Sequence, residues 1–103
     1  MKTVLIGFVI NIGTFKDDNG KDVPYSNRII TFISNTGENK TRKGFFPFEQ
    51  KFKLAELSDI LGVQPDDRII NEALMTMVNK AIKVDFAAVG GQLKIVNFEL
   101  EQK

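Results

Sequence analysis

The segment KLAELSDILG, residues 53–62, separates two parts of the chain that both show the residue pattern of β-strands. Its apolar residues recur at the spacing of one helical face, and Gly62 is a typical helix stop. Pro65 and the pair Asp66-Asp67 predict the start of a second helix, because an Asp side chain there accepts hydrogen bonds from free backbone N–H groups. We interpret the apolar stripe that follows as core packing; it comprises Ile69, Ile70, Ala73, Leu74, Met77, Val78 and Ala81. The middle of the chain is therefore predicted to be a helix or a helix pair.

Three strands are expected before this helical segment. The first covers residues 3–14, where apolar residues on both faces indicate a central strand. Alternation predicts that its larger apolar set shares one face, namely Val4, Ile6, Phe8, Ile10 and Ile12. Asn19-Gly20 predicts a tight hairpin turn within residues 17–22, and the second strand then covers about residues 25–34. After a turn at residues 35–40, a third strand is expected over about residues 41–52, in which Pro47 indicates an edge or a bulge.

Two further strands, at residues 82–89 and 92–100, form a predicted hairpin around Gly90-Gly91. The order of three strands, a helical segment and two strands is that of the OB-fold, a five-stranded Greek-key barrel with a helix between strands three and four. An SH3-like barrel would lack so long a helical insertion, and a ferredoxin-like fold would need a helix between its first two strands. The chain of 103 residues is therefore expected to form a mainly β, single OB-fold domain over residues 1–103.

Composition disfavours most catalytic and metal chemistry. The chain has no Cys and no His, so it lacks a thiol nucleophile, a thiolate or imidazole metal ligand and a histidine general base. The acidic residues Asp17, Asp18 and Asp22 lack the ligand spacing of a calcium loop and are interpreted as turn formers. We predict a non-catalytic protein without cofactor or metal. No apolar run approaches the roughly 18 residues of a membrane span, and the bacterial host cytoplasm is the expected location.

Charge is unevenly distributed, which points to an anion-binding first half. Residues 1–53 carry nine Lys or Arg against five Asp or Glu, whereas residues 54–103 carry five against eight. An OB barrel commonly binds nucleic acid across strands two and three, with basic side chains at the phosphates and flat side chains stacked on bases. The expected phosphate contacts are Lys16, Lys21, Arg28, Lys40, Arg42, Lys43 and Lys51. The expected stacking residue is Tyr25, and the further candidates are Phe15, Phe46 and Phe48.

Some of these residues also fit a structural role. Tyr25 flanks a polar turn, which favours a surface platform over a buried tyrosine. Arg28 leads into an apolar strand and fits either the binding face or a barrel end. Alternation sends Phe46, Phe48 and Phe52 to one face and Phe45 to the other, and at least half of the phenylalanines in this region are expected to be core. Four more are assigned to the core from their apolar surroundings: Phe8, Phe32, Phe86 and Phe98.

The segment GKDVPYS, residues 20–26, opens a strand after a basic hairpin and resembles the Gly-Lys-Pro-Tyr-Ser sequence of small phage single-stranded DNA-binding proteins of the gene V type. The final hairpin, residues 82–100, is similar to theirs as well. The resemblance implies a homodimer that coats single-stranded DNA without sequence preference, with Tyr25 stacking on bases and Lys21 in the binding hairpin. This chain departs from the pattern by inserting Asp22-Val23, by placing Ile33 near a second family tyrosine, and by containing the helical segment.

These observations lead to two hypotheses from different classes. In the first, the chain is a non-catalytic protein that coats single-stranded DNA during phage or mobile-element replication, with RNA as the alternative ligand. In the second, it is an OB-type protein-interaction module without nucleic-acid binding, whose working surface is the helical segment with Met75 and Met77. Affinity for oligonucleotide that falls with salt would separate the first hypothesis from the second.

Overall fold

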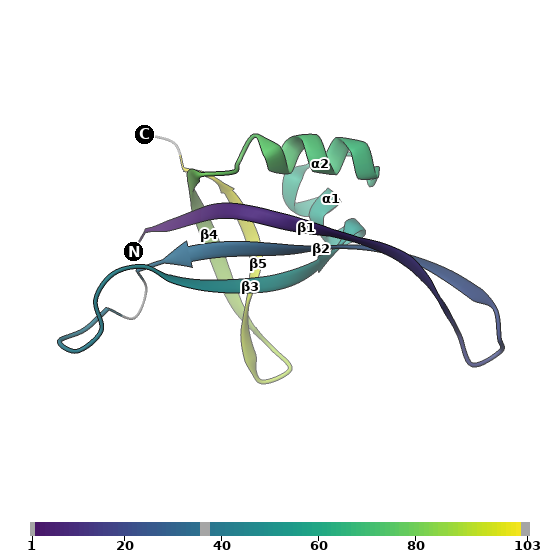
Figure 1. Ribbon diagram of the computed structural model, residues 1–103, viewed down its shortest axis with the longest axis horizontal. Coiled ribbons are helices and arrows are strands. Elements are labelled where there is room, and N and C mark those ends of the chain that lie inside the picture. Colours follow the sequence, from purple (N-terminus) through teal and green to yellow (C-terminus); the bar gives the residue numbers. More distant parts are fainter. Residues whose placement is uncertain (1, 36–37, 102–103) are drawn as a thin grey trace.

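The computed structural model describes residues 2–35 and 38–101 and contains one open sheet of five antiparallel strands with two helices (Figure 1). The elements are β1 (Thr3–Lys16), β2 (Asp22–Ser34), β3 (Phe46–Lys53), α1 (Leu54–Leu61), α2 (Asp67–Met75), β4 (Lys80–Val89) and β5 (Gln92–Leu100). The strand order across the sheet is β3-β2-β1-β4-β5. The predicted mainly β class is therefore confirmed.

The longest feature is the β1–β2 hairpin, which extends well beyond the rest of the molecule (Figure 1). Its pairing runs from Thr3 opposite Ser34 to Lys16 opposite Asp22. The predicted turn is present, and the Asp17 carboxylate stabilises it by accepting the backbone N–H groups of Asn19 and Lys21, each at 2.9 Å. Both strands reach further into this arm than the sequence predicts, which contributes to a molecule of 53 × 30 × 20 Å.

A bulge in β1 changes which of its residues face the core. The pairing shifts between Leu5 and Gly7, so the alternation of side chains moves by one residue. Leu5 is fully buried, whereas Ile6 and Ile12 are exposed. The prediction that Val4, Ile6, Phe8, Ile10 and Ile12 share one face is therefore wrong.

Helix α1 begins and ends at the predicted residues, and α2 begins at the predicted cap. The predicted end of the second helix is wrong, because α2 ends at Met75 and Ala81 already lies in β4. Gly62 follows α1 with a φ of 67°, the left-handed conformation that glycine adopts without strain. Asp66 caps α2 by accepting the N–H groups of Arg68 and Ile69 at 3.0 and 3.2 Å. The predicted apolar stripe is core only in part, because Ile69 stays 38% exposed. The buried residues contributed by the helices and the turn after them are Leu57, Ile70, Leu74 and Met77.

The remaining core comes from inward-facing residues of the strands. Phe98 packs edge-on against Phe32 and Phe52, with ring centroids 5.9 and 5.6 Å away, and all three side chains are buried. Phe8 packs against this core from its margin. The prediction that Phe86 belongs to the core is wrong, because its side chain is 38% exposed. Phe86 follows a register shift between Asp85 and Phe86 in the β4–β5 pairing.

The third strand begins at Phe46 rather than near Thr41, because residues 38–45 form a loop. The Asn39 side chain organises this loop by accepting the N–H groups of Thr41 and Arg42 at 2.8 and 3.0 Å. Part of the turn predicted over residues 35–40 falls on residues 36 and 37, which lie outside the described residues.

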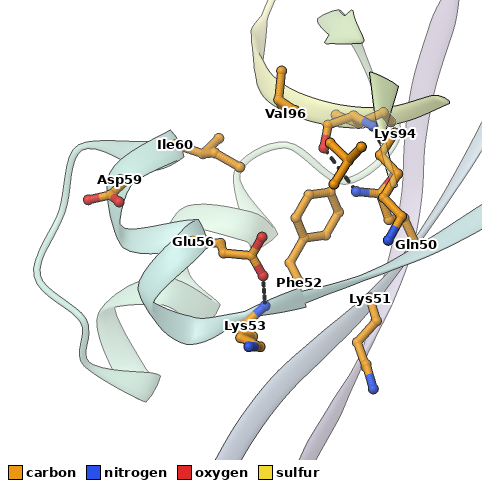
Figure 2. A pocket seen from close by; sticks show the side chains of 11 residues that line it. Gln50, Lys51, Phe52, Lys53, Glu56, Asp59, Ile60, Lys94 and Val96 are labelled. Carbon is orange, nitrogen blue, oxygen red and sulfur yellow. Dashed lines mark hydrogen bonds between the residues drawn. The ribbon is translucent and has the colours of Figure 1, made fainter. Parts of the chain in front are cut away.

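The Gln50 side chain on β3 makes two hydrogen bonds to the backbone of β5. The Gln50 amide nitrogen donates to the Ile95 carbonyl oxygen at 2.9 Å, and the Ile95 N–H donates to the Gln50 amide oxygen at 3.0 Å (Figure 2). This amide makes the two hydrogen bonds that a paired backbone residue would make, although no ladder joins β3 and β5 in the described part of the chain. The first and last strands of the sheet order are thereby held together.

Candidate nucleic-acid interface

The outer face of β1, β2 and β3 is defined by the strand register. Arg28 and Ile30 on β2 are fully buried, so the alternating residues Tyr25, Asn27 and Ile29 face the opposite way. Directly paired residues of antiparallel strands project from the same face, and Asn27 lies opposite Lys53 while Ile29 lies opposite Lys51. Tyr25, Lys51 and Lys53 therefore occupy one face.

The Tyr25 ring lies against the backbone of β1. Gly13 is its cross-strand partner, and a Cβ added at Gly13 would stand 2.5 Å from the Tyr25 hydroxyl oxygen and 2.8 Å from ring carbon Cζ. Phe15 continues the aromatic surface toward the hairpin tip, with its ring centroid 6.3 Å from that of Tyr25 and a tilt of 36°. The absence of a side chain at Gly13 thus leaves room for the hydroxyl end of the tyrosine ring against β1.

A groove of about 680 Å³ borders this aromatic pair. Its lining combines the two rings, two amides and two ammonium groups: Phe15, Tyr25, Asn11, Asn27, Lys51 and Lys53. Rings offer stacking surfaces, amides can donate and accept hydrogen bonds, and lysines attract phosphates. Each of these groups can contact a base or a phosphate.

A second groove, of about 570 Å³, lies between β3, α1 and β5 (Figure 2). It shares Lys51 and Lys53 with the first groove and adds Lys94 from β5. Its α1 side carries the carboxylates of Glu56 and Asp59, and Glu56 accepts the Lys53 backbone N–H at 2.9 Å. Because these carboxylates repel phosphate, the groove beside Tyr25 is the better anion site.

Arg28 is not available to a ligand, which corrects its assignment as a phosphate contact. Its side chain is fully buried, and Nη2 contacts the Asp67 carboxylate at 2.8 Å. Nε donates to Asn71 at 2.8 Å, and Nη1 donates to the Ser26 hydroxyl and the Asn27 carbonyl, both at 3.0 Å. The hydrogen bond from the Ser26 hydroxyl, together with that from Arg28, lowers the pKa of Asp67 below its ordinary value. Arg28 therefore fastens α2 to β2.

Two of the phenylalanines proposed for stacking are already engaged. Phe48 faces inward and stacks on the buried Phe32 ring, with centroids 5.2 Å apart and planes 20° from parallel. The Arg42 guanidinium carbon lies 3.8 Å from the centroid of the Phe46 ring, so it covers one face of that ring. Neither ring belongs to the groove beside Tyr25, whereas Phe15 does.

The other basic residues are divided between the two ends of the molecule. Lys16 and Lys21 are at the tip of the β1–β2 arm, where Lys16 lies 3.7 Å from the Asp22 carboxylate. Lys40, Arg42 and Lys43 are in the loop between β2 and β3, at the opposite end of the long axis (Figure 1). Of the seven predicted phosphate contacts, only Lys51 lines the groove beside Tyr25.

The grooves contain residues that the sequence-based set omits. Asn11 and Asn27 could have been found from the two-residue period on either side of Gly13 and Tyr25. Lys53 could have been found from its alternation with Lys51. Lys94 has no such signal, because its approach to β3 depends on the link between Gln50 and Ile95.

The helical surface considered for protein binding is not formed as predicted. Of its two methionines, Met77 is buried at 4% exposure, and only Met75, at 61%, is available on the surface.

Among residues 2–35 and 38–101, no helix has the length and apolarity to cross a membrane. Within the same residues, no group of three or more Cys, Asp or Glu side chains could hold a metal ion.

Comparisons of the chain with protein-family models, with curated proteins and with solved structures find no match. Evidence for a function therefore comes from the groove beside Tyr25.

Proposed function

We propose that the chain is a non-catalytic protein that binds single-stranded DNA in the groove beside Tyr25. The observation that carries the proposal is the Tyr25 ring, which is supported by the Gly13 backbone and lies on the same face as Lys51 and Lys53. A base stacked on such a ring is worth about 1–3 kcal/mol, and neighbouring lysines neutralise the adjoining phosphates. Stacking accepts any base, so binding is expected to be independent of sequence.

The fold supports this assignment. We propose that the sheet is a partly open OB-type barrel, because joining the outer strands of the order β3-β2-β1-β4-β5 would close five strands into a ring. The Gln50 contacts with Ile95 hold those two strands together. Oligonucleotides bind OB barrels across strands two and three, where the groove beside Tyr25 lies. Coating of single strands during phage or mobile-element replication is the role that this binding would serve.

The groove favours a single strand over a duplex. Bases in a duplex are already stacked on their neighbours, whereas a single strand has base faces free to stack on Tyr25. Two lysines in the groove predict a modest salt dependence, with a slope of log K against log salt of about −1.4 at roughly −0.7 per phosphate. The groove has no feature that selects deoxyribose, so RNA is included in the test as a second ligand.

The first test uses the emission of Tyr25, because the chain has one Tyr and no Trp. The protein would be titrated with oligo-dT, oligo-U and a DNA duplex at about 50 mM and about 500 mM salt. Quenching by oligo-dT that weakens with salt, and that is small with duplex, supports the proposal. Quenching by oligo-U alone would change the ligand to RNA.

Two other outcomes are decisive. Binding of a fluorescently labelled oligo-dT without a change in tyrosine emission would place the site away from Tyr25. Absence of binding at both salt concentrations would overturn the DNA-binding function and leave the protein-interaction hypothesis.

A further inference from the structure

Most of β1 has one edge without a neighbouring strand. β1 pairs with β2 along its whole length, but its pairing with β4 ends after Thr3, Val4 and Leu5. From Gly7 to Phe15, no strand in the described part of the chain lies against this second edge. Figure 1 shows β1 continuing into the arm, where β2 is the one strand beside it. The edge presents backbone hydrogen-bonding groups that another strand could use.

This edge also lacks the usual protection against pairing. The nine residues GFVINIGTF, 7–15, include no charged residue and no proline. Four of their apolar side chains are exposed by about half, on both faces of the strand: Val9, Ile10, Ile12 and Phe15. In contrast, the edge strand β3 carries Pro47, Lys51 and Lys53. The chain protects its β3 edge and leaves the β1 edge ready to pair.

We propose that a second copy of this chain covers the edge, with β1 of each copy paired antiparallel about a two-fold axis. An uncharged strand meets no like-charge repulsion from its own copy. The edge offers no cation to the phosphates of a nucleic acid, which excludes DNA as the occupant. A two-fold pairing is self-complementary and closes after two copies, as in most homo-oligomers.

Symmetry restricts the register of the two strands. Residues directly opposite each other must project from the same face, and a two-fold axis normal to the sheet does not exchange the faces, so one residue must lie opposite itself. With Asn11 on the axis, Ile10 faces Ile12 of the second copy, and Val9 faces Gly13. An axis through Ile10 would place Val9 opposite Asn11 instead. The register centred on Asn11 therefore pairs apolar residues with each other.

The mass of the full chain tests the proposal without nucleic acid. Analytical ultracentrifugation at micromolar concentrations should give twice the chain mass of 11.6 kDa. A monomeric mass throughout would overturn the proposal. This experiment is independent of DNA binding, so its failure would leave the groove beside Tyr25 to be judged by the oligonucleotide titration.

Charge variants test the interface and its register. Ile10→Lys and Ile12→Glu should each weaken the dimer more than tenfold, whereas their equimolar mixture should form a heterodimer, because Lys and Glu would then lie opposite each other. Leu93→Lys is the control, since Leu93 is 72% exposed on β5, away from this edge, and its dimer should persist. Circular dichroism would confirm that each variant is folded. A dimer unaffected by Ile10→Lys would overturn the interface, and a mixture that stays monomeric would overturn the register.

The absence of cysteine allows a direct test of the axis. Asn11→Cys places a thiol opposite its own copy, at the Cα separation of about 4.5–5.5 Å of directly opposed antiparallel residues, which a disulfide accepts, and mild oxidation should link most chains as dimers. Lys21→Cys, at the exposed hairpin tip, is the matched control and should remain largely unlinked. Equal linking of the two variants would reflect collision alone and would overturn the proposed axis.

Discussion

The Tyr25 ring lies across Gly13 on the neighbouring strand, so closely that a Cβ at Gly13 would stand 2.5 Å from the tyrosine hydroxyl oxygen. Any residue larger than glycine at that position would collide with the ring. The position of the aromatic surface therefore depends on a residue that carries no side chain.

Gly13→Ala should displace the Tyr25 ring and weaken oligo-dT binding several-fold, because part of the stacking energy of about 1–3 kcal/mol would be lost. Tyrosine emission of the free protein should change as well. Gly7→Ala is the control, since a Cβ there meets no atom within 4 Å and its emission should match wild type. Unchanged emission and affinity in Gly13→Ala would mean that the ring does not rest on Gly13 in solution.

Tyr25→Ala should weaken oligo-dT binding about tenfold, equivalent to about 1–2 kcal/mol, whereas Tyr25→Phe should retain most of the affinity because the ring remains. Anisotropy of a labelled oligonucleotide measures both. Phe45→Ala is the matched control, since Phe45 is 44% exposed in the loop between β2 and β3 and lines neither groove. An equal loss of oligo-dT affinity in Phe45→Ala and Tyr25→Ala would contradict the assignment of Tyr25 as the stacking residue.

Lys51→Gln and Lys53→Gln should each flatten the salt dependence of binding, by about 0.7 in the slope of log K against log salt. Both variants remove the charge and shorten the side chain by only one atom, and Lys53→Gln keeps the backbone N–H that Glu56 accepts. Lys83→Gln removes a lysine from β4 that lines neither groove, so its slope should equal that of wild type. If the slope flattens by the same amount in all three variants, the effect comes from net charge and the groove has no special role.

Asp67→Asn should destabilise the protein by about 1–2 kcal/mol at neutral pH, because it removes the charged partner of the buried Arg28. The loss is smaller than for a fully buried pair, since the Asp67 side chain is 47% exposed. Urea unfolding measures the difference. Asp18→Asn, in the turn of the arm, is the control and should change stability little.

The same pair predicts how stability depends on pH. The pKa of Asp67 is lowered from its ordinary value of 3.8, so the folded protein binds this proton less readily than the unfolded chain does. The stabilisation is thus complete above pH 3.8 and is lost as the pH falls through the lowered value. The stability gap between wild type and Asp67→Asn should narrow in that acidic range. A gap that stays constant would show that the carboxylate charge does not contribute.

Local signals predicted most of the elements, because each depends on a few adjacent residues. Asn19-Gly20 marks a turn, Gly62 ends α1 and Asp66 caps α2, as the sequence indicated. The bulge after Leu5 could not be predicted, since it depends on the pairing of two strands rather than on residues within one.

The candidate site was harder to predict for the same reason. The burial of Arg28 depends on Asp67, which lies 39 residues further along the chain. The basic residues of the first half look like one cluster in sequence, yet the strands carry them to opposite ends of the molecule. Tyr25 lies beside lysines because β2 and β3 pair in a particular register, and sequence alone does not fix that register.

Strands β3 and β5 meet along a seam without a strand ladder in the described residues, held by the Gln50 contacts with Ile95 and by the packing of Phe52 on Phe98. Rotation of one glutamine side chain would release both of its hydrogen bonds, whereas separating β4 from β5 would require the loss of a whole row. The Ile95 amide proton should accordingly exchange with solvent deuterium faster than the amide protons held between β4 and β5. Because Lys94 and Lys51 lie on the two sides of this seam, its opening would change the width of the groove between them.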